Sequence, residues 1–382
     1  MEPLQRNLME RELLTPRTDW PNQFDQLGFH FHSLGDVYWD ESACYRFSSS
    51  EIDCIEEATW KLHELCMQAV DHVISNRAFK PFALPDWFLE YLIDSWEADS
   101  PSLFGRFDLS YDGTHPPKLL EYNADTPTSL IEASIAQWNW QRQVFPQYDQ
   151  FNLIHEKLIS HWKHLRTQLD SPVYFACVKE HPEDLGNIEY LRDTALQADI
   201  DGRQIFVEDI GWSVDQLCFV DLEDNPIHTL FKLYPWEWMA NEEFGPLLPG
   251  TRLKLLEPAW KTLLSSKVIL AVLWELNPGH PNLLPCYLEE SLAPAEYVKK
   301  PRFSREGENV EIHASHGIIS QPGSYGVEGF VYQAYAPLPD FEGNFPVIGS
   351  WTIGGEAAGI GIRENRQQIT TNTSRFVPHY FN

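Results

Sequence analysis

The sequence predicts a mixed α/β fold, and three segments carry that prediction. Residues 51–75 repeat apolar side chains at helical spacing over the length of a long amphipathic helix. Residues 172–208 show the pattern strand, helix, strand, which is typical of an α/β layer. The last hundred residues alternate short apolar runs with glycine and proline, which favours antiparallel strands. Because no clear linker separates these regions, we expect them to interleave.

The first half of the chain contains further helices and one hairpin. Ser50 is placed to cap the 51–75 helix, and Pro85 opens a second helix over 85–97. Two apolar runs, 105–113 and 118–125, flank a His-Pro-Pro turn, which predicts an antiparallel hairpin. Apolar spacing then predicts helices over 129–140 and 151–168.

The second half continues with the α/β layer and ends in strands. Residues 172–178 and 203–208 have the composition of buried strands and enclose a helix over 187–197. A helical stretch over 258–276 ends at a Pro-Gly-His-Pro break. Beyond it, strands are expected over 296–300, 309–313, 327–335 and 346–354.

Composition excludes several classes of protein. Of 382 residues 43% are hydrophobic and 22% charged, which is typical of a globular chain rather than a disordered one. Lys and Arg number 28 against 56 Asp and Glu, so the net charge is −28. This charge argues against nucleic acid or an anionic membrane as a partner, since phosphate binding needs a basic face. An anionic substrate must therefore be held by local cations or by a metal.

The sequence shows no clear membrane-spanning, secretory or cysteine-based motif. No apolar run is long enough to span a bilayer, and the N-terminus is too charged for a signal peptide. Six cysteines lie scattered without a CxxC pair, so neither a zinc site nor a dense disulfide framework is indicated. We expect a reduced, soluble, cytoplasmic protein.

The predicted hairpin carries the most informative residues. Glu121 and Asn123 are two apart on one strand and therefore share a face, and Asp108 can lie opposite them. Two carboxylates and an amide oxygen form a hard oxygen site of the kind that holds Mg²⁺ with a phosphate ligand. Arg106 would share this face and could contact a phosphoryl oxygen. The alternative is a surface hairpin with solvated acids.

Lysines later in the chain could meet a phosphate. Lys267 lies in an apolar helical stretch, where the plain alternative is a side chain that reaches out to solvent. Lys300 ends a predicted strand and precedes a polar loop that contains Gly307, an arrangement suited to a nucleotide, although a simple turn would look the same.

Two further segments have the character of a binding site. The strand over 328–335, which includes Gln333, runs into a proline-rich hinge that could offer backbone groups to a purine, or could be a core strand. Arg363 and the segment 369–379 concentrate cations and hydroxyls in an acidic chain, but an ordinary C-terminal strand is also possible.

These segments together resemble one family. The pattern GRFD…EYNADTPTSL, the PGHPNLLP segment after Lys267, YVKKP with its loop, and GFVYQAY resemble the glutathionylspermidine synthetase family, and most closely its stand-alone acid–amine ligase members. The resemblance extends over nearly the whole chain. It implies a circularly permuted ATP-grasp fold with an additional α/β pre-ATP-grasp region, in which the metal ligands precede the phosphate-binding lysines.

The resemblance also implies a role for each matching residue. Asp108, Glu121 and Asn123 would be the Mg²⁺ ligands, and Arg106 would stabilise the transition state of phosphoryl transfer. Thr126 and Thr128 stand where the glutathione-using members carry serines near the acid substrate, and this departure argues against glutathione as that acid. The nucleotide-binding residues would be Arg106, Phe107, Asp108, Lys267, Lys300, Gly307 in a covering loop, Gln333 beside the adenine, and Arg363.

On this basis the chain divides into three expected parts. Residues 1–100 form a mainly helical N-terminal region, and residues 101–255 form the metal-binding ATP-grasp half with the inserted α/β layer. Residues 256–382 form a β-rich nucleotide-binding subdomain with a lid loop.

The implied reaction joins a carboxylate to an amine through an acyl phosphate, with ATP and Mg²⁺ as cofactors. The substrates would be small molecules, such as a peptide and a polyamine, and the acidity of the chain would attract a cationic amine. Glu183 and Glu189, with Glu237 nearby, are candidates for the amine site, although each could be part of a solvated acidic face.

Two other hypotheses remain open at this point. One is a non-catalytic ATP-binding protein derived from such a ligase. The other is a tryptophan-rich glycoside hydrolase with two carboxylates, which would leave the lysines and Arg106 without a role.

Overall fold

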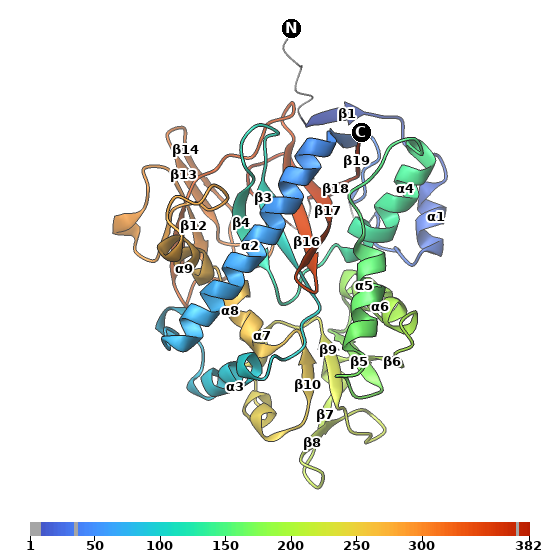
Figure 1. Ribbon diagram of the computed structural model, residues 1–382, viewed down its shortest axis with the longest axis vertical. Helices are drawn as coiled ribbons and strands as arrows, with labels where there is room; N and C mark the ends of the chain where they lie inside the picture. Colours follow the sequence, from blue (N-terminus) through green and yellow to red (C-terminus); the bar gives the residue numbers. More distant parts are fainter. Residues whose placement is uncertain (1–8, 34–36, 372–373) are drawn as a thin grey trace.

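The centre of the molecule is a five-stranded antiparallel sheet that joins two distant stretches of the chain (Figure 1). A computed structural model describes residues 9–33, 37–371 and 374–382; residues 1–8, 34–36 and 372–373 lie outside the described part. The predicted hairpin forms two strands of the central sheet, and the C-terminal segment supplies the other three. In spatial order these strands are β18 (Arg375–Val377), β17 (Glu356–Asn365), β16 (Phe345–Ile353), β3 (Phe104–Ser110) and β4 (Lys118–Asn123).

A parallel sheet forms the α/β layer beneath the central sheet (Figure 1). The predicted strand–helix–strand pattern is confirmed here, because β5 (Val173–Cys177) and β6 (Gly202–Phe206) flank helix α6 (Pro182–Leu196) and pair in parallel. The sheet has the order β10 (Lys254–Leu256), β9 (Thr229–Lys232), β5 (Val173–Cys177) and β6 (Gly202–Phe206). A small hairpin of β7 (Gly211–Ser213) and β8 (Cys218–Val220) extends from it.

A second antiparallel sheet lies on the other side of the hairpin (Figure 1). It contains the predicted strand that carries Lys300 and the strand that carries Gln333, which are adjacent. Its order is β11 (Cys286–Tyr287), β15 (Phe330–Ala334), β12 (Tyr297–Pro301), β13 (Glu311–Ala314) and β14 (Gly317–Ser320). A three-stranded sheet of β1 (Glu10–Leu13), β2 (Ala43–Phe47) and β19 (His379–Phe381) brings the two ends of the described chain together. The three parts expected from the sequence therefore interleave.

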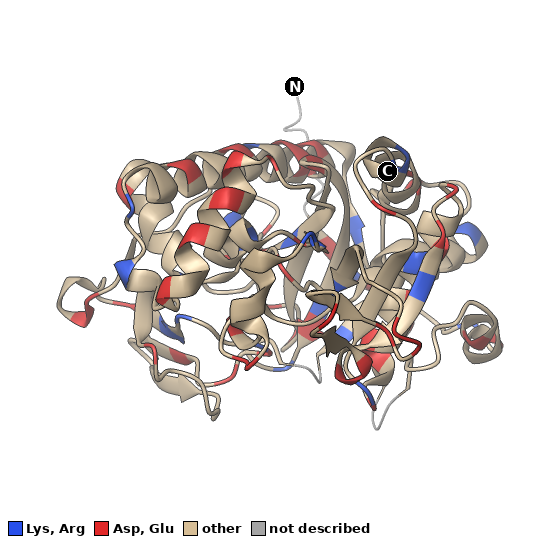
Figure 2. Ribbon diagram, turned by 90° about the horizontal axis from the view of Figure 1, so that it is seen from below, with Lys and Arg blue, Asp and Glu red and all other residues tan. Residues whose placement is uncertain are grey.

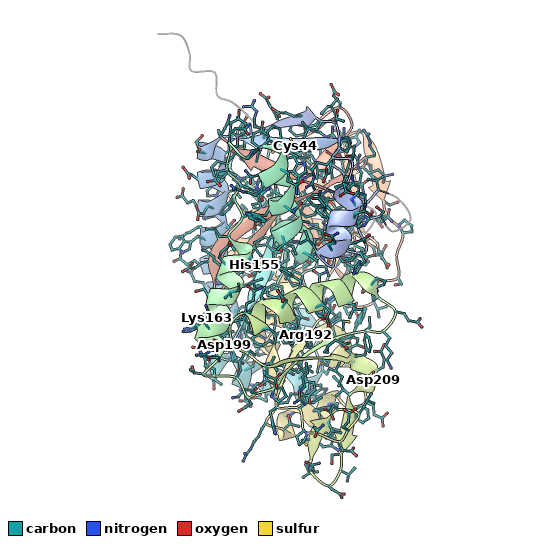
Figure 3. The ribbon with its side chains drawn as sticks, turned by 90° about the vertical axis from the view of Figure 1, so that its right-hand side faces the viewer. Cys44, His155, Lys163, Arg192, Asp199 and Asp209 are labelled. Carbon is teal, nitrogen blue, oxygen red and sulfur yellow. The ribbon has the colours of Figure 1, made fainter. Side chains whose placement is uncertain are left out.

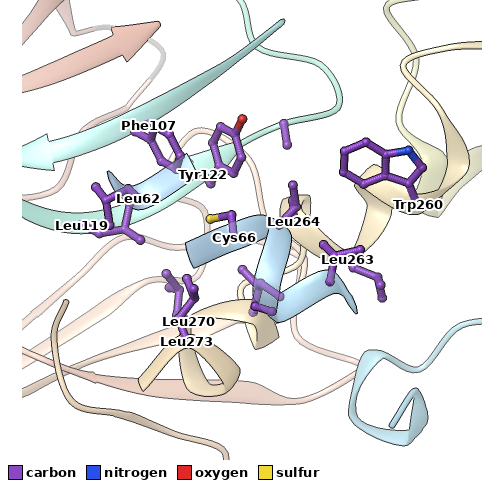
Figure 4. Close-up of a cluster of buried hydrophobic side chains, with 14 of the residues drawn as sticks. Leu62, Cys66, Phe107, Leu119, Tyr122, Trp260, Leu263, Leu264, Leu270 and Leu273 are labelled. Atoms are coloured by element: carbon purple, nitrogen blue, oxygen red, sulfur yellow. The ribbon is translucent and has the colours of Figure 1, made fainter. Parts of the chain in front are cut away.

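Helices cover both faces of the central sheet. The long helix α2 crosses one face, and α5 packs against β16 and β17. Phe107 and Tyr122 stack between α2 and the sheet with ring centroids 3.8 Å apart, in the cluster shown in Figure 4. The helices are α1 (Trp20–Gln26), α2 (Ser49–Ser75), α3 (Asp86–Glu97), α4 (Gln137–Val144), α5 (Ile154–Leu165), α6 (Pro182–Leu196), α7 (Trp236–Met239), α8 (Thr262–Ser265) and α9 (Val268–Leu276).

Two sequence expectations about helix ends are corrected. Ser48, not Ser50, caps α2, because Ser48 and Glu51 form a reciprocal capping box. The helix expected over 258–276 is interrupted between α8 and α9. Ser266 has an extended backbone there, and the backbone N–H of Lys267 donates to the carbonyl of Arg302 at 2.8 Å. A contact with a distant strand end thus overrides the helical pattern.

The helix expected from Ser129 begins with a π-helical turn over Glu132–Ala136 before α4. Ser129 itself has a positive φ of 67°, so the chain turns sharply where the segment after β4 enters the helix. π-helical turns occur frequently at functional sites.

Candidate active site

The hairpin places four polar side chains on one face of the central sheet. Arg106 lies opposite Asn123 in the ladder, and Asp108 lies opposite Glu121. Directly opposed residues of an antiparallel pair point to the same side. We call Arg106, Asp108, Glu121 and Asn123 the hairpin site. The convergence predicted from the spacing of these residues is confirmed.

Arg106 is held rigidly within the hairpin site. Its Nε donates to Asp108 Oδ1 at 2.8 Å, and its Nη1 donates to the carbonyl of Thr128 at 2.6 Å. Its guanidinium lies 5.9 Å from the centroid of the Trp351 ring. A Cβ at Gly349 on the next strand would come within 2.8 Å of Arg106 Cδ, so only glycine leaves room for this side chain.

Cations surround the two carboxylates. Arg363 on β17 reaches Asp108 at 3.4 Å, and Lys267 at the start of α9 reaches Glu121 at 3.2 Å. Although burial opposes ionisation of Glu121, the charges of Lys267 and Lys300 lower its pKa to about 2. Glu121 is therefore ionised at neutral pH.

Lys300 bridges the second antiparallel sheet to the hairpin. Its Nζ donates to the carbonyl of Leu120 at 2.8 Å and to Gln333 Oε1 at 2.7 Å. Gln333 in turn donates to the carbonyl of Leu119 at 2.9 Å. Burial lowers the pKa of the Lys300 ammonium to about 8, although Glu121 favours the charged form.

A first cleft opens between this sheet and the hairpin site. Its volume, counted to its open mouth, is about 820 Å³. One end is polar and holds Asp108, Glu121, Lys267 and Lys300. The rest of the cleft has apolar walls and is bordered by residues 334–336; the apolar lining residues are Leu120, Val298, Val310, Ile312, Leu338, Val347 and Ile369.

A second cleft of about 900 Å³ continues from the first toward the parallel sheet. The two clefts share Glu121, Ser304, Glu306 and Arg363, so they meet at the hairpin site. The second cleft is polar and carries charges of both signs, with lining residues that include Arg106, Asn123, Thr126, Thr128, His181, Glu183, Asp184, Tyr234, Trp238 and Arg305. Burial raises the pKa of Asp184 to about 6.

The loop over residues 302–310 lies across the junction of the clefts. Arg305 donates to Thr126 Oγ1 at 2.7 Å and pairs with Glu237 at 3.2 Å. Gly307 has a φ of +70°, and a Cβ there would come within 2.5 Å of the carbonyl oxygen of Thr370. The loop can pack this closely against the C-terminal segment only because residue 307 is glycine.

Most of the residues singled out from the sequence line these clefts. Lys267, Lys300, Gly307, Gln333 and Arg363 border the first cleft. Thr126, Thr128 and Glu183 border the second. Of the segment 369–379, Ile369 and Thr370 line the first cleft, whereas residues 372 and 373 lie outside the described part.

Two of the predicted site residues lie elsewhere. The ring of Phe107 points to the opposite face of the sheet, into the core with Tyr122, because neighbouring strand residues alternate in direction. Only its backbone can face the cleft. Glu189 pairs with Arg192 on α6, and Figure 3 shows Arg192 and His155 on the outer side of the molecule. Glu189 lines a separate surface pocket and neither of the two clefts.

Two residues of the second cleft had no sequence signal of their own. Tyr234 and Trp238 looked like ordinary aromatic residues of a Trp-rich segment. Glu132, in an apolar helical run, had no signal either; it lines neither cleft, is fully buried and accepts a hydrogen bond from Tyr38 at 2.5 Å. Burial and the nearby Glu183 raise the pKa of Glu132 to about 8.

The charge of the molecule and its metal-ligating groups set limits on the ligand. Acidic positions recur over helices and loops in the view of Figure 2. Within the described ranges, no group of three or more His, Cys, Asp and Glu side chains is arranged to hold a metal ion. The hairpin site has two carboxylates and one amide, so a metal held there would need further oxygens from its ligand.

All six cysteines lie in the described ranges and are free thiols. None of the helices in those ranges combines the length and apolarity needed to cross a membrane.

Comparisons with known proteins agree with the resemblance. Residues 11–382 match the family model described as glutathionylspermidine synthase pre-ATP-grasp. A provisionally named acid–amine ligase of Haemophilus influenzae is 40% identical, and the alignment covers 96% of this chain and 97% of that protein. A trypanothione synthetase of Crithidia fasciculata is 26% identical, and the alignment covers 85% of this chain but only 54% of that protein.

One solved structure bears on the fold alone. A glutathione synthetase-like effector from Globodera pallida in apo form superimposes with a TM-score of 0.56, over 97% of this chain and 98% of that one, at 9% identity. The mixed α/β fold is thus confirmed and is shared with a glutathione synthetase-like protein. The expectation of an enzyme of the carbon–nitrogen ligase class is likewise confirmed through the named relatives, which are ligases and synthetases. The chain belongs to the glutathionylspermidine synthase pre-ATP-grasp family.

Proposed function

We propose that this protein is an ATP- and Mg²⁺-dependent ligase that joins a carboxylate to an amine through an acyl phosphate. The observation that carries the proposal is the set of charges at the hairpin site. Four cationic side chains, Arg106, Lys267, Lys300 and Arg363, gather around Asp108 and Glu121, and Glu306 adds a third carboxylate where the clefts meet. In a chain with a net charge of −28, four cations against three carboxylates are a local excess of positive charge, which suits a polyanion such as a nucleoside triphosphate.

The first cleft suits the nucleotide. Its apolar walls can hold a purine ring, and residues 334–336 border it where the edge of that ring would lie. Lys267 and Lys300 stand at the polar end, where the phosphates would lie. Loop 302–310, with Gly307, would cover the phosphates and exclude water.

The oxygen donors of the hairpin site fit Mg²⁺. Asp108, Glu121 and Asn123 supply hard oxygen ligands on one face, and the ion prefers such ligands together with phosphate oxygens and water. Bound there, Mg²⁺ would neutralise charge on the phosphates. Arg363 and Lys267, which now pair with Asp108 and Glu121, would then be free to contact phosphate oxygens.

The chemistry requires two steps at the junction of the clefts. In the first step an oxygen of the substrate carboxylate attacks the γ-phosphorus of ATP, the bond to the bridging oxygen breaks, and ADP leaves. Arg106 is fixed by Asp108 and Thr128 and would stabilise charge on the transferred group.

In the second step the amine attacks the acyl carbon and inorganic phosphate leaves. The nitrogen loses a proton as the bond forms, and the carboxylates of the second cleft are candidate acceptors. Glu183 and Asp184 would also attract a cationic amine. Thr126 and Thr128 lie between Arg106 and Arg305 and are the proposed contacts for the acid substrate.

The order of the site along the chain supports a circularly permuted ATP-grasp arrangement. The acidic hairpin precedes Lys267 at the start of α9 and Lys300 on β12, although all of them meet at one cleft. We retain the division into residues 1–100, 101–255 and 256–382 as a functional proposal. A cytoplasmic location is also proposed, because six free thiols suit a reducing compartment.

The test begins with calorimetric titration of the protein with Mg·ATP. An acid-and-amine library scored by phosphate release then follows. Phosphate release that needs both an acid and an amine supports the ligase. Tight nucleotide binding without such release from any pair supports the alternative, a non-catalytic ATP-binding protein. No nucleotide binding contradicts both.

A further inference from the structure

A buried ion pair anchors the start of the strand that carries Arg106 and Asp108. Glu257 is fully buried, and its carboxylate accepts the backbone N–H groups of Leu103 and Phe104 at 2.9–3.0 Å. Lys261 pairs with Glu257 at 2.6 Å and donates to the carbonyl of Phe104 at 2.7 Å. The pair thus holds both backbone polar groups of Phe104, two residues before Arg106.

A second buried ion pair anchors the end of the partner strand. Asp125, two residues after Asn123, pairs with Lys232 at 2.6 Å, and both side chains are 1% exposed. Lys232 Nζ also donates to the carbonyl of Tyr234 at 2.9 Å. Because the hairpin is antiparallel, the start of β3 and the end of β4 lie at the same edge, next to the rung of Arg106 and Asn123.

Trp236 joins the two ion pairs. Its backbone N–H donates to Asp125 Oδ2 at 2.8 Å, and its indole Nε1 donates to the carbonyl of Glu257 at 3.0 Å. Its ring lies 4.6 Å from Lys232 Nζ. Asp125, Lys232, Trp236, Glu257 and Lys261 therefore form one connected network, which we call the buried anchor.

Stability alone does not explain the buried anchor. Removing two ion pairs from water costs about as much as their attraction returns, and well-packed apolar side chains of similar volume often serve as well or better. What apolar side chains cannot do is hold the backbone at the start of β3 and the carboxylate of Asp125, two residues beyond β4, through directed hydrogen bonds. The geometry at this edge of the hairpin is thus the property that the charges supply.

We propose that the buried anchor is a positioning device that sets the spacing of the two hairpin strands so that Asp108, Glu121 and Asn123 face one metal ion. This inference rests on the proposed function, because it assumes that the hairpin holds Mg²⁺ with a nucleotide. None of the anchor residues touches the nucleotide cleft, so they are positioning residues rather than catalytic ones.

The test measures how much Mg²⁺ strengthens nucleotide binding. A non-hydrolysable ATP analogue is titrated into wild type, Glu257→Gln and Asp125→Asn, with Mg²⁺ and again with EDTA. Both substitutions keep the side-chain size and remove one ion pair. We expect each variant to lose about 10-fold or more of the Mg²⁺-dependent gain in affinity. Metal-free affinity should stay near the wild-type value, because the adenine end of the cleft is untouched.

Glu41→Gln is the matched control. Glu41 is 2% exposed, pairs with Arg17 at 2.6 Å and accepts the backbone N–H of Arg17, but it lies outside both clefts. The Glu41→Gln variant should keep the wild-type ratio of the nucleotide affinity with Mg²⁺ to the affinity with EDTA, even if its unfolding temperature falls.

Other outcomes contradict the inference in distinct ways. Folded anchor variants that keep the wild-type ratio, or that lose affinity equally with and without Mg²⁺, overturn it. Failure of both variants to fold also counts against it, because the anchor would then serve folding. A wild-type protein that binds no nucleotide refutes the proposed function instead.

Discussion

Removal of the Arg106 side chain gives the sharpest prediction about the chemistry. In Arg106→Ala the transferred phosphoryl group loses a donor that Asp108 and Thr128 hold in place at 2.8 and 2.6 Å. One such donor contributes roughly 3–4 kcal/mol in the transition state, which corresponds to about 10²–10³ in kcat. The nucleotide Kd should change much less, because Lys267 and Lys300 remain.

The same substitution also affects folding. Asp108 is 4% exposed, and among the described residues its remaining ion-pair partner is Arg363, at 3.4 Å. Leaving a buried carboxylate short of its partner costs up to about 3–5 kcal/mol, and Arg363 should keep the loss at the lower end. Rates must therefore be measured well below the unfolding temperature of the variant.

The assay is phosphate release with saturating Mg·ATP and a productive acid–amine pair, alongside calorimetry for the nucleotide. Arg106→Lys serves as the second variant, because it keeps the charge but loses the planar fork. We expect it to remain impaired while folding more stably than the alanine variant. Wild-type turnover in folded Arg106→Ala refutes the role given to Arg106.

Three further predictions concern other parts of the site. Burial lowers the pKa of Lys300 to about 8 in the free protein, and a bound phosphate would favour the charged form of this side chain. Nucleotide affinity should therefore fall about tenfold between about pH 7 and pH 9, and Lys300→Met should remove most of this pH dependence. A Lys300→Met variant whose calorimetric pH profile matches that of the wild type would contradict this prediction. Gly307→Ala, whose new Cβ meets the Thr370 carbonyl, should weaken nucleotide binding by roughly 1–3 kcal/mol in calorimetry. Gly279→Ala, at φ +83° in open space, is its control and should bind normally. Phe107→Ala should cost about 3–5 kcal/mol in urea unfolding but leave nucleotide affinity of the folded protein within about twofold, since the ring lies on the far face; a large affinity loss would place that ring in the site.

The hairpin site could be predicted from the sequence because its geometry is local. A turn between two short strands fixes which residues face each other, so Asp108 and Glu121 could be paired from their spacing. The alternation of side chains along a strand also indicates that Phe107 points away from Arg106. The resemblance of the whole motif had instead placed Phe107 among the nucleotide-binding residues.

Contacts between distant segments could not be predicted in this way. The break before Lys267 depends on the carbonyl of Arg302, and the position of Lys300 depends on the carbonyl of Leu120. Helical periodicity has no information about such partners. Glu257 and Lys261 are similar: an acid and a base four residues apart suggest an exposed helical pair, yet both are buried beneath the hairpin.

The most direct test of the proposed ligase is phosphate release measured with Mg·ATP, an acid and an amine, with each component omitted in turn. The proposed mechanism predicts release that requires all three components, stops when Mg²⁺ is removed with EDTA, and yields one amide product for each phosphate. Phosphate release that is unaffected by omitting the acid and the amine, with no amide formed from any pair in the library, would contradict it.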